Sequence, residues 1–280
     1  MAAHKEPAEP MSVLTPERES AFPALLRTWR RRRRLSQLDL ALDAGVSQRH
    51  LSFLESGRAN PSRGMILQLS ETLEVPLRDR NAWLTAAGFA PIFAARSLED
   101  PRMAQVMNAV RTMLANHEPF PAVAIDGVWN IRLANKAFEG LTALLGADLW
   151  ERVGGEPRNL MRLFFHPDGI RPFVTNWPDI APLLWRRAQR EAESLGGEAM
   201  KVLLDKLAPA LDAATLASPP ETALVPVLPL EMERDGLHIS LFAVIATFGT
   251  AQDITADELR IESFFPADAA TEALFRAAAA

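Results

Sequence analysis

The sequence of 280 residues contains no cysteine. A chain without cysteine forms no disulfide, no thiolate zinc site, no iron–sulfur cluster and no thiol redox switch. This absence fits a reducing cytosol, and we expect a cytoplasmic protein. The longest apolar run, Ile239–Phe248, is well short of the roughly 18 residues that a membrane-spanning helix needs. Met1–Pro10 has no apolar core, so no secretory signal is expected there.

The sequence also lacks the usual signatures of catalysis and metal binding. The five histidines are scattered, with no HxH or HExxH spacing, so we expect no metal site. The chain contains no GxSxG nucleophile elbow, no Walker loop and no GxGxxG fingerprint. We therefore predict no catalytic residue and no cofactor.

Charge is distributed unevenly along the chain. Residues 18–63 contain ten arginines and four acidic residues, a net charge of +6 (10 − 4). The whole chain carries −5, so the remainder sums to −11 (−5 − 6). A basic segment on an acidic protein is typical of a nucleic-acid surface, although a solvated helix face gives the same charge. The order of the residues decides between these interpretations.

Residues 21–90 are expected to form an independent all-α domain of five helices. Apolar residues recur at helical spacing from Phe22 to Trp29, in a helix that ends in the run Arg30–Arg34. The other four helices are predicted at 36–43, 47–55, 62–73 and 79–87. Glycines follow three of these helices, where a left-handed C-terminal cap favours glycine: Gly45, Gly57 and Gly88.

The segment Ser36–Glu55 has the pattern of a helix-turn-helix. Ser36 and Asp39 predict a capping box that begins the first helix. Gly45 supplies the positive φ that the tight turn needs, and Ser47 caps the second helix. In the major groove of DNA, Arg bonds guanine and Gln bonds adenine. The outward residues of the second helix are therefore the predicted base-reading residues: Gln48, Arg49 and Ser52.

Polar residues around this segment are predicted to contact phosphate, because phosphate contacts position a protein on DNA. Five consecutive arginines circle a helix, so we expect only two or three of Arg30–Arg34 to reach phosphate. The predicted phosphate contacts are Gln37, Arg58, Asn60, Arg32 and Arg33.

Residues 20–75 resemble the lambda-repressor/Cro-like (XRE-type) family of helix-turn-helix domains. The resemblance rests on Gln37, on Ala44-Gly45-Val46-Ser47 and on the tail Glu55-Ser-Gly-Arg-Ala-Asn-Pro-Ser. It implies a five-helix DNA-binding domain whose members often bind pseudo-palindromic sites as dimers. We expect a transcription regulator that is a homodimer, with double-stranded DNA as its partner.

After residue 100 the pattern changes to strands mixed with helices. Apolar runs flank the turn signals Asp126-Gly127 and Asp235-Gly236, which predicts two β-hairpins. The predicted strands are Ala122–Asp126, Val128–Ala134, Val225–Arg234, Leu237–Gly249 and Glu258–Phe265. The predicted helices are 101–116, Asn135–Leu145, most of 158–216 and Ala269–Ala280. These elements predict an α+β domain with an antiparallel sheet at 117–275, with 91–116 as the connection and 1–20 as a disordered lead-in.

Aromatic residues are abundant in this domain, which predicts either an ordinary core or an apolar cavity between sheet and helices. Residues 124–138 resemble the opening of a PAS-type sensor domain, and Asn159–Pro167 with Asn176-Trp177-Pro178 resembles the MmyB-like regulators. That resemblance implies a PAS-like cavity for a fatty acid or a similar small apolar ligand. The predicted cavity residues are Trp129, Phe138, Phe164, Trp177 and Phe242.

No charged residue stands out as a partner for an anionic head group in such a cavity. Arg162 and Arg171 are candidates only because an anion needs a cation, and each also fits a surface or helix-end arginine.

Three hypotheses remain. In the first, an apolar ligand changes the C-terminal domain and thereby how two DNA-binding domains are spaced on DNA. In the second, the C-terminal domain is a dimerisation or protein-partner module with a filled core. In the third, the protein is an enzyme on a small apolar substrate, which nothing supports beyond the possible pocket. Finding a cavity or a filled core separates the first two.

Overall fold

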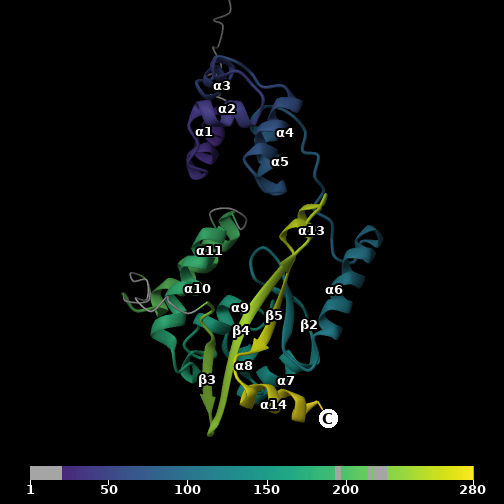
Figure 1. Cartoon of the computed structure of the whole chain (residues 1–280), viewed down its shortest axis with the longest axis vertical. Helices are drawn as coiled ribbons and strands as arrows, with labels where there is room; N and C mark the ends of the chain where they lie inside the picture. Colours follow the sequence, from purple (N-terminus) through teal and green to yellow (C-terminus); the bar gives the residue numbers. More distant parts are fainter. Residues whose placement is uncertain (1–20, 193–196, 214–215, 217–225, 280) are drawn as a thin grey trace, which may run out of the picture. The chain divides into compact units, whose positions relative to one another are not determined.

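The computed structural model describes residues 21–192, 197–213, 216 and 226–279 (Figure 1). The described chain divides into two compact units. Unit 1 comprises residues 21–74 and 82–90, and unit 2 comprises 75–81 and the described residues from 91 onward. The predicted lead-in at 1–20 lies outside the described residues. Among the described residues, no helix combines the length and apolarity needed to cross a membrane.

Unit 1 is built from α-helices, as predicted. They are α1 (Phe22–Arg32), α2 (Gln37–Asp43), α3 (Gln48–Glu55), α4 (Arg63–Thr72) and α5 (Leu77–Ala86), whose first turn belongs to unit 2. Apolar side chains from all five helices are completely buried, including Leu26, Leu40, Leu51, Leu69 and Trp83. Burial of these side chains against one another is the main stabilising contribution to a helical unit of this size.

Short-range contacts set the ends of α2 and α3. The Ser36 hydroxyl accepts a hydrogen bond from the Asp39 amide, and the Asp39 carboxylate accepts one from the Ser36 amide. Ser47 caps α3 by accepting from the amide of His50. Gly45, in the turn between them, has a φ of +63°, a conformation that a residue with a Cβ adopts only at a cost. The helix-turn-helix is therefore defined by local chemistry.

Unit 2 contains the predicted antiparallel sheet. Its five strands are β1 (Ala122–Ile125), β2 (Ile131–Ala134), β3 (Leu230–Arg234), β4 (Leu237–Thr247) and β5 (Arg260–Pro266). The strand order is β2-β1-β5-β4-β3, and every neighbouring pair is antiparallel. Asp235 and Gly236 have φ values of +51° and +79°, which fits the two-residue turn predicted between β3 and β4.

Three predicted strands begin later than expected. β5 begins at Arg260 rather than Glu258, because Glu258 is the last residue of a short helix, Ile254–Glu258. β2 begins at Ile131 rather than Val128, because the Asp126 carboxylate accepts hydrogen bonds from the amides of Val128 and Asn130 and holds the chain in a loop. β3 begins at Leu230, and Val225, the predicted start, lies outside the described residues. Both hairpins exist, with a wider first turn.

Helices cover both faces of the sheet (Figure 1). On one face, α6 (Ala104–Asn116) packs Met107 and Val110 against Ala124 and Ile261 of the sheet. The other face carries the larger core, to which α7 (Lys136–Leu145), α8 (Leu149–Arg152), α9 (Leu160–Phe165), α10 (Trp177–Glu191), α11 (Gly197–Leu207) and α14 (Ala269–Ala278) contribute. Adjacent residues of β1 point to opposite cores, as the pleat of a strand requires.

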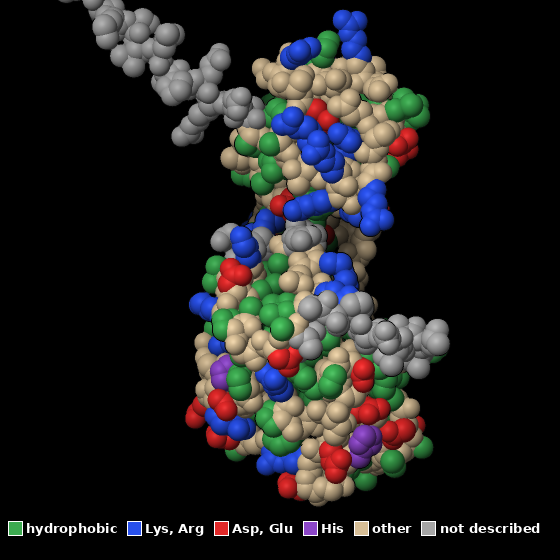
Figure 2. Space-filling view, turned by 90° about the vertical axis from the view of Figure 1, so that its left-hand side faces the viewer, with side chains coloured by type: hydrophobic (Ala, Val, Ile, Leu, Met, Phe, Trp, Pro, Cys, Tyr) green, Lys and Arg blue, Asp and Glu red, His purple; other side chains and the backbone are tan. Residues whose placement is uncertain are grey.

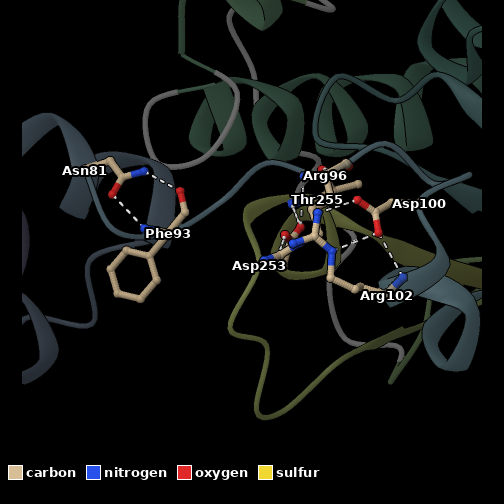
Figure 3. A network of polar contacts seen from close by, with 7 residues as sticks. All are labelled: Asn81, Phe93, Arg96, Asp100, Arg102, Asp253 and Thr255. Carbon is tan, nitrogen blue, oxygen red and sulfur yellow. Dashed lines mark hydrogen bonds and ion pairs between the residues drawn. The ribbon is translucent and has the colours of Figure 1, made fainter. Parts of the chain in front are cut away.

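Within the segment 91–116, which was predicted to connect the two domains, residues 91–103 make polar contacts inside unit 2 (Figure 3). The Arg96 guanidinium pairs with Asp253 at 2.7 Å, and the Thr255 hydroxyl donates to the Arg96 carbonyl at 2.7 Å. Asp253 is also the N-cap of α13 (Ile254–Glu258). Nearby, the hydrogen bond from Arg102 lowers the pKa of Asp100 to about 2. The segment is thus an ordered part of this unit.

Candidate nucleic-acid interface and apolar cavity

Helix α3 has one buried face and one exposed face. Leu51 and Leu54 are completely buried, whereas Gln48 and Arg49 are exposed and Ser52 is half-buried. The Arg49 guanidinium lies 5.3 Å from the centre of the Phe53 ring, one turn along the helix. The structure therefore places the three predicted base-reading residues on one outward surface, at the capped N-terminal half of the helix.

A buried carboxylate joins the first three helices. Glu55 at the end of α3 is 3% exposed and accepts from Arg30 Nε at 2.6 Å and from Gln37 Nε2 at 2.7 Å. Burial alone would raise the pKa of Glu55, but the hydrogen bonds from Arg30 and Gln37 outweigh it and lower that pKa below its ordinary value. The hydrogen bond between Arg30 and Glu55 also raises the pKa of Arg30. Glu55 and Arg30 thus stay ionised and hold α1 against α3.

This arrangement bears on the predicted phosphate contacts. The amide nitrogen of Gln37 is engaged by Glu55, and Arg33 donates from Nε to the Leu73 carbonyl at 2.8 Å. The structure therefore gives these two residues a role inside the unit and lends no support to phosphate contacts from them. Arg32 lies over the Trp29 ring at 5.2 Å, still exposed. Arg58 and Asn60 are exposed after α3.

The exposed basic groups of unit 1 are all arginines. The described part of the unit carries nine arginines and five acidic residues, a net charge of +4 (9 − 5). Figure 2 shows basic side chains gathered on the visible face of this unit. Within the described residues, Arg31 and Arg34 of the arginine run have no side-chain partner, which leaves them available to an anion.

Unit 2 contains a partly open apolar cavity of about 230 Å³ that is lined by residues of the sheet and of α7, α9 and α10. This is well above the roughly 10–15 Å³ that a cavity needs to hold one water molecule. Four of the five predicted residues line it: Trp129, Phe138, Phe164 and Phe242. The fifth, Trp177, is not among the residues that line this cavity, and its ring stacks on Phe164 at 5.1 Å.

Two charged residues are among those that line this cavity. Arg187 of α10 and Glu262 of β5 both line it, and they are joined at 2.5 Å. Arg187 Nε also pairs with Glu191 at 2.9 Å, and Glu191 pairs with Arg260 at 2.6 Å. All four side chains are less than one-fifth exposed. We call Arg187, Glu191, Arg260 and Glu262 the charge cluster.

The charge cluster also involves an aromatic residue of the wall. Trp129 Nε1 donates to Glu191 at 2.7 Å, and the Arg187 guanidinium lies 4.5 Å from the centre of the Trp129 ring. Burial alone would lower the pKa of Arg187, but the charges of Glu262 and Glu191 outweigh it and raise that pKa. Arg187 therefore stays a cation next to the apolar space.

Sequence reasoning missed this cluster and proposed two other arginines. Arg162 donates to the Gly154 carbonyl at 3.0 Å, and Arg171 donates to the Ala210 carbonyl at 2.7 Å; neither lines the cavity. A signal for Arg187 was present in α10, where Ile180, Leu184, Arg187 and Glu191 follow a spacing of four, three and four residues. Two charged residues thus continue the apolar face of an amphipathic helix.

The comparisons with known proteins agree with this geometry. A family model described as helix-turn-helix matches residues 26–79. A second, described as the MmyB-like transcription regulator ligand binding domain, matches residues 106–278, more than half of the chain. The protein is therefore a DNA-binding transcription regulator with a ligand-binding domain. The chain belongs to the MmyB-like transcription regulators.

Two further comparisons add little. No curated protein matches the chain. A solved structure described as "Structure of an RNA-binding Light-Oxygen-Voltage Receptor" is similar at 15% identity with a TM-score of 0.28. That similarity covers 94% of this chain and 62% of the receptor chain, so the chain spans less than two-thirds of the receptor's length. Within the described residues, no group of three or more acidic or histidine side chains could hold a metal ion.

Proposed function

We propose that this protein is a one-component regulator that binds a pseudo-palindromic operator as a homodimer and responds to a small apolar ligand in the cavity of unit 2. The observation that carries the proposal is the pairing of an exposed, capped recognition helix with a separate apolar cavity in one chain. Fatty acids are the ligand class that the family resemblance implies. Cytoplasmic location follows from this function and from the lack of cysteine.

In this proposal Gln48, Arg49 and Ser52 read bases. Arg49 is suited to a bidentate contact with guanine, because its guanidinium is exposed and already oriented over Phe53. Arg58 and Asn60, together with the exposed arginines of α1, supply phosphate contacts. A single recognition helix contacts too few bases to find one site in a genome, which supports a dimer.

The ligand acts by favouring one of two conformations, since a ligand with equal affinity for both shifts nothing. Within unit 2, β5 carries Glu262 at the cavity and follows directly after α13. Glu258 of α13 pairs with Arg78 in the first turn of α5 at 2.5 Å, and Asp257 accepts from the Leu77 amide. These contacts support a route from the cavity to the helix that continues into unit 1.

The test is a selection of genomic DNA fragments by the full chain, followed by affinity measurements on the selected site. We expect Arg49→Ala to weaken binding to that site by about 5–150-fold, the 1–3 kcal/mol of one base contact, while binding to random DNA changes far less. Arg111→Ala, which removes an exposed arginine of α6, is the matched control and should change neither.

Two results would count against the proposal. Selection of no preferred sequence, or equal affinity of Arg49→Ala and the parent protein for the selected site, would remove the recognition helix from the function. Sedimentation of the protein with its site would show the number of copies bound, and one copy would overturn the homodimer.

A further inference from the structure

The outward face of α3 is centred on two residues. An α-helix turns by about 100° per residue, so residues four apart share a face. The buried residues of α3, which define its inner face, are Leu51, Leu54 and Glu55. The opposite direction falls between Arg49 and Phe53, which are four residues apart. These two residues therefore occupy the middle of the surface that the recognition helix presents.

Phe53 is an aromatic residue that is only half-buried at this outward position. The Arg49 guanidinium lies over its ring, 5.3 Å from the ring centre. The chain after α3 also returns to this residue, because the Phe53 carbonyl accepts from the amides of Arg58 at 2.9 Å and of Ala59 at 3.2 Å. Phe53 thus lies between Arg49, a predicted base contact, and Arg58, a predicted phosphate contact.

The major groove of DNA offers an apolar group to such a ring. Thymine carries a 5-methyl group at the edge of the groove, and phenylalanine is among the side chains that contact it. Neighbouring bases of one strand are about 3.4 Å apart along the DNA axis. If Arg49 bonds a guanine, a ring centred 5.3 Å from its guanidinium reaches a neighbouring base pair. Gln48 and Ser52, the other predicted base-reading residues, are polar and offer no comparable apolar surface.

We infer that Phe53 determines specificity by contacting the 5-methyl group of a thymine in a base pair next to the guanine that Arg49 binds. Each DNA sequence that one copy of the protein recognises then contains a guanine with a thymine in an adjacent base pair. The inference rests on the proposed DNA-binding function, and it names a base pair that the operator contains.

A purely supporting role for the Phe53 ring makes a different prediction. If the ring only orients Arg49, its removal weakens binding by the same factor with or without the methyl group on the DNA. If the ring contacts thymine, its removal also abolishes the difference in affinity between thymine and uracil, which differ only in the 5-methyl group. A comparison of these two bases therefore separates the two roles.

The experiment uses the full-length protein and the site that it selects from genomic DNA fragments. The guanine is located as the position at which base substitution weakens binding of the parent protein but not of Arg49→Ala. Each thymine in the adjacent base pairs is then replaced by deoxyuridine, and affinity is measured by fluorescence anisotropy at a fixed salt concentration. We expect one such replacement to weaken binding about fourfold, the contribution of one buried methyl group.

Variants of Phe53 assign this preference to its ring. Phe53→Ala should bind the thymine site and the uracil site equally, whereas Phe53→Leu keeps an apolar side chain and should still prefer thymine. Leu42→Ala is the matched control, because it removes an apolar side chain of α2 that is 71% exposed. This control should retain the fourfold preference.

The outcomes separate this inference from the proposal it rests on. Equal affinity of the parent protein for the two sites, or a site with no thymine beside that guanine, overturns the inference while sequence-specific binding stands. A preference for thymine that persists in Phe53→Ala also overturns it, because another residue then contacts the methyl group. If no preferred sequence is selected, both are wrong. If Phe53→Ala does not fold, Phe53→Gln, which has a polar side chain of similar length, replaces it in the comparison.

Discussion

The two units place their charged side chains in opposite ways. In unit 1 the arginines lie mostly on the surface, and a single buried pair, Arg30 with Glu55, sits where α1 meets α3. In unit 2 the charge cluster is buried, two of its residues line an apolar cavity, and its charges cancel. Surface charge of one sign attracts a polyanion over a distance, whereas buried, balanced charge discriminates between ligands in contact. The surface charge of unit 1 thus suits a polyanionic partner such as DNA.

The largest expected effect comes from unbalancing the charge cluster. Arg187→Leu leaves two buried carboxylates facing one remaining arginine, and we expect a loss of about 3–5 kcal/mol in the stability of unit 2. The double variant Arg187→Leu/Glu262→Leu leaves Glu191 paired with Arg260, and should cost much less than the single variant. Hydrogen exchange of peptides from α10 and β5 measures both. A mild single variant would mean that the cluster is solvated, and the contrast between the units would fail.

A smaller effect is expected at the buried pair of unit 1. Glu55→Gln keeps the shape of the side chain but leaves Arg30 without its anion, and should cost about 2 kcal/mol. Hydrogen exchange of peptides from residues 21–74 measures it. Glu71→Gln, an exposed residue of α4, is the control and should stay within about 0.5 kcal/mol of the parent protein.

The same variant makes a prediction about pH. The pKa of Glu55 in the folded protein lies below its ordinary value of 4.5, so ionised Glu55 stabilises the fold above pH 4.5. That contribution is lost as the pH falls through the lowered pKa of the folded state. The stability difference between the parent protein and Glu55→Gln should therefore be constant from pH 6 to 8 and shrink below pH 4.5. A difference that grows in acid would contradict it.

The smallest effect concerns the local signals that define the recognition helix. Ser47→Ala removes the cap of α3 and should cost about 1 kcal/mol, seen as faster exchange of amides in the first turn of α3. Ser56→Ala, at the other end of the helix, removes only a hydroxyl that donates to the Phe53 carbonyl, and should change exchange little. Equal effects would mean that α3 is held by packing alone.

The features that could be predicted from the sequence are those that depend on residues close together in the chain. The ends of α2 and α3 depend on residues at most three positions apart, such as Ser36 with Asp39. These local sequence signals were sufficient to predict the helix-turn-helix. The turn at Asp235-Gly236 was equally local. Four of the predicted cavity residues line the cavity, because the abundant large aromatic residues of this domain tend to be buried.

The charge cluster could not be found in this way. Arg187 and Glu262 are 75 residues apart, and only the pairing of β5 with its neighbours brings them together. Helical spacing places Arg187 on the apolar face of α10, but it does not show that Glu262 is its partner. Gln37 and Arg33 show the same limit in unit 1, because their partners Glu55 and Leu73 come from other helices. Side-chain roles that depend on distant contacts are not readable from spacing.

The arginine run of α1 has a consequence for how DNA affinity should respond to salt. Each phosphate that a protein neutralises releases condensed counterions and contributes about −0.9 to the slope of log affinity against log salt concentration. Arg30 forms an ion pair with Glu55. Arg33 donates a hydrogen bond to the Leu73 carbonyl and forms an ion pair with Glu74. The run should therefore contribute a slope shallower by about 1.8 per copy than five free arginines would give. The salt dependence of DNA affinity should therefore be smaller than the number of arginines in the run suggests.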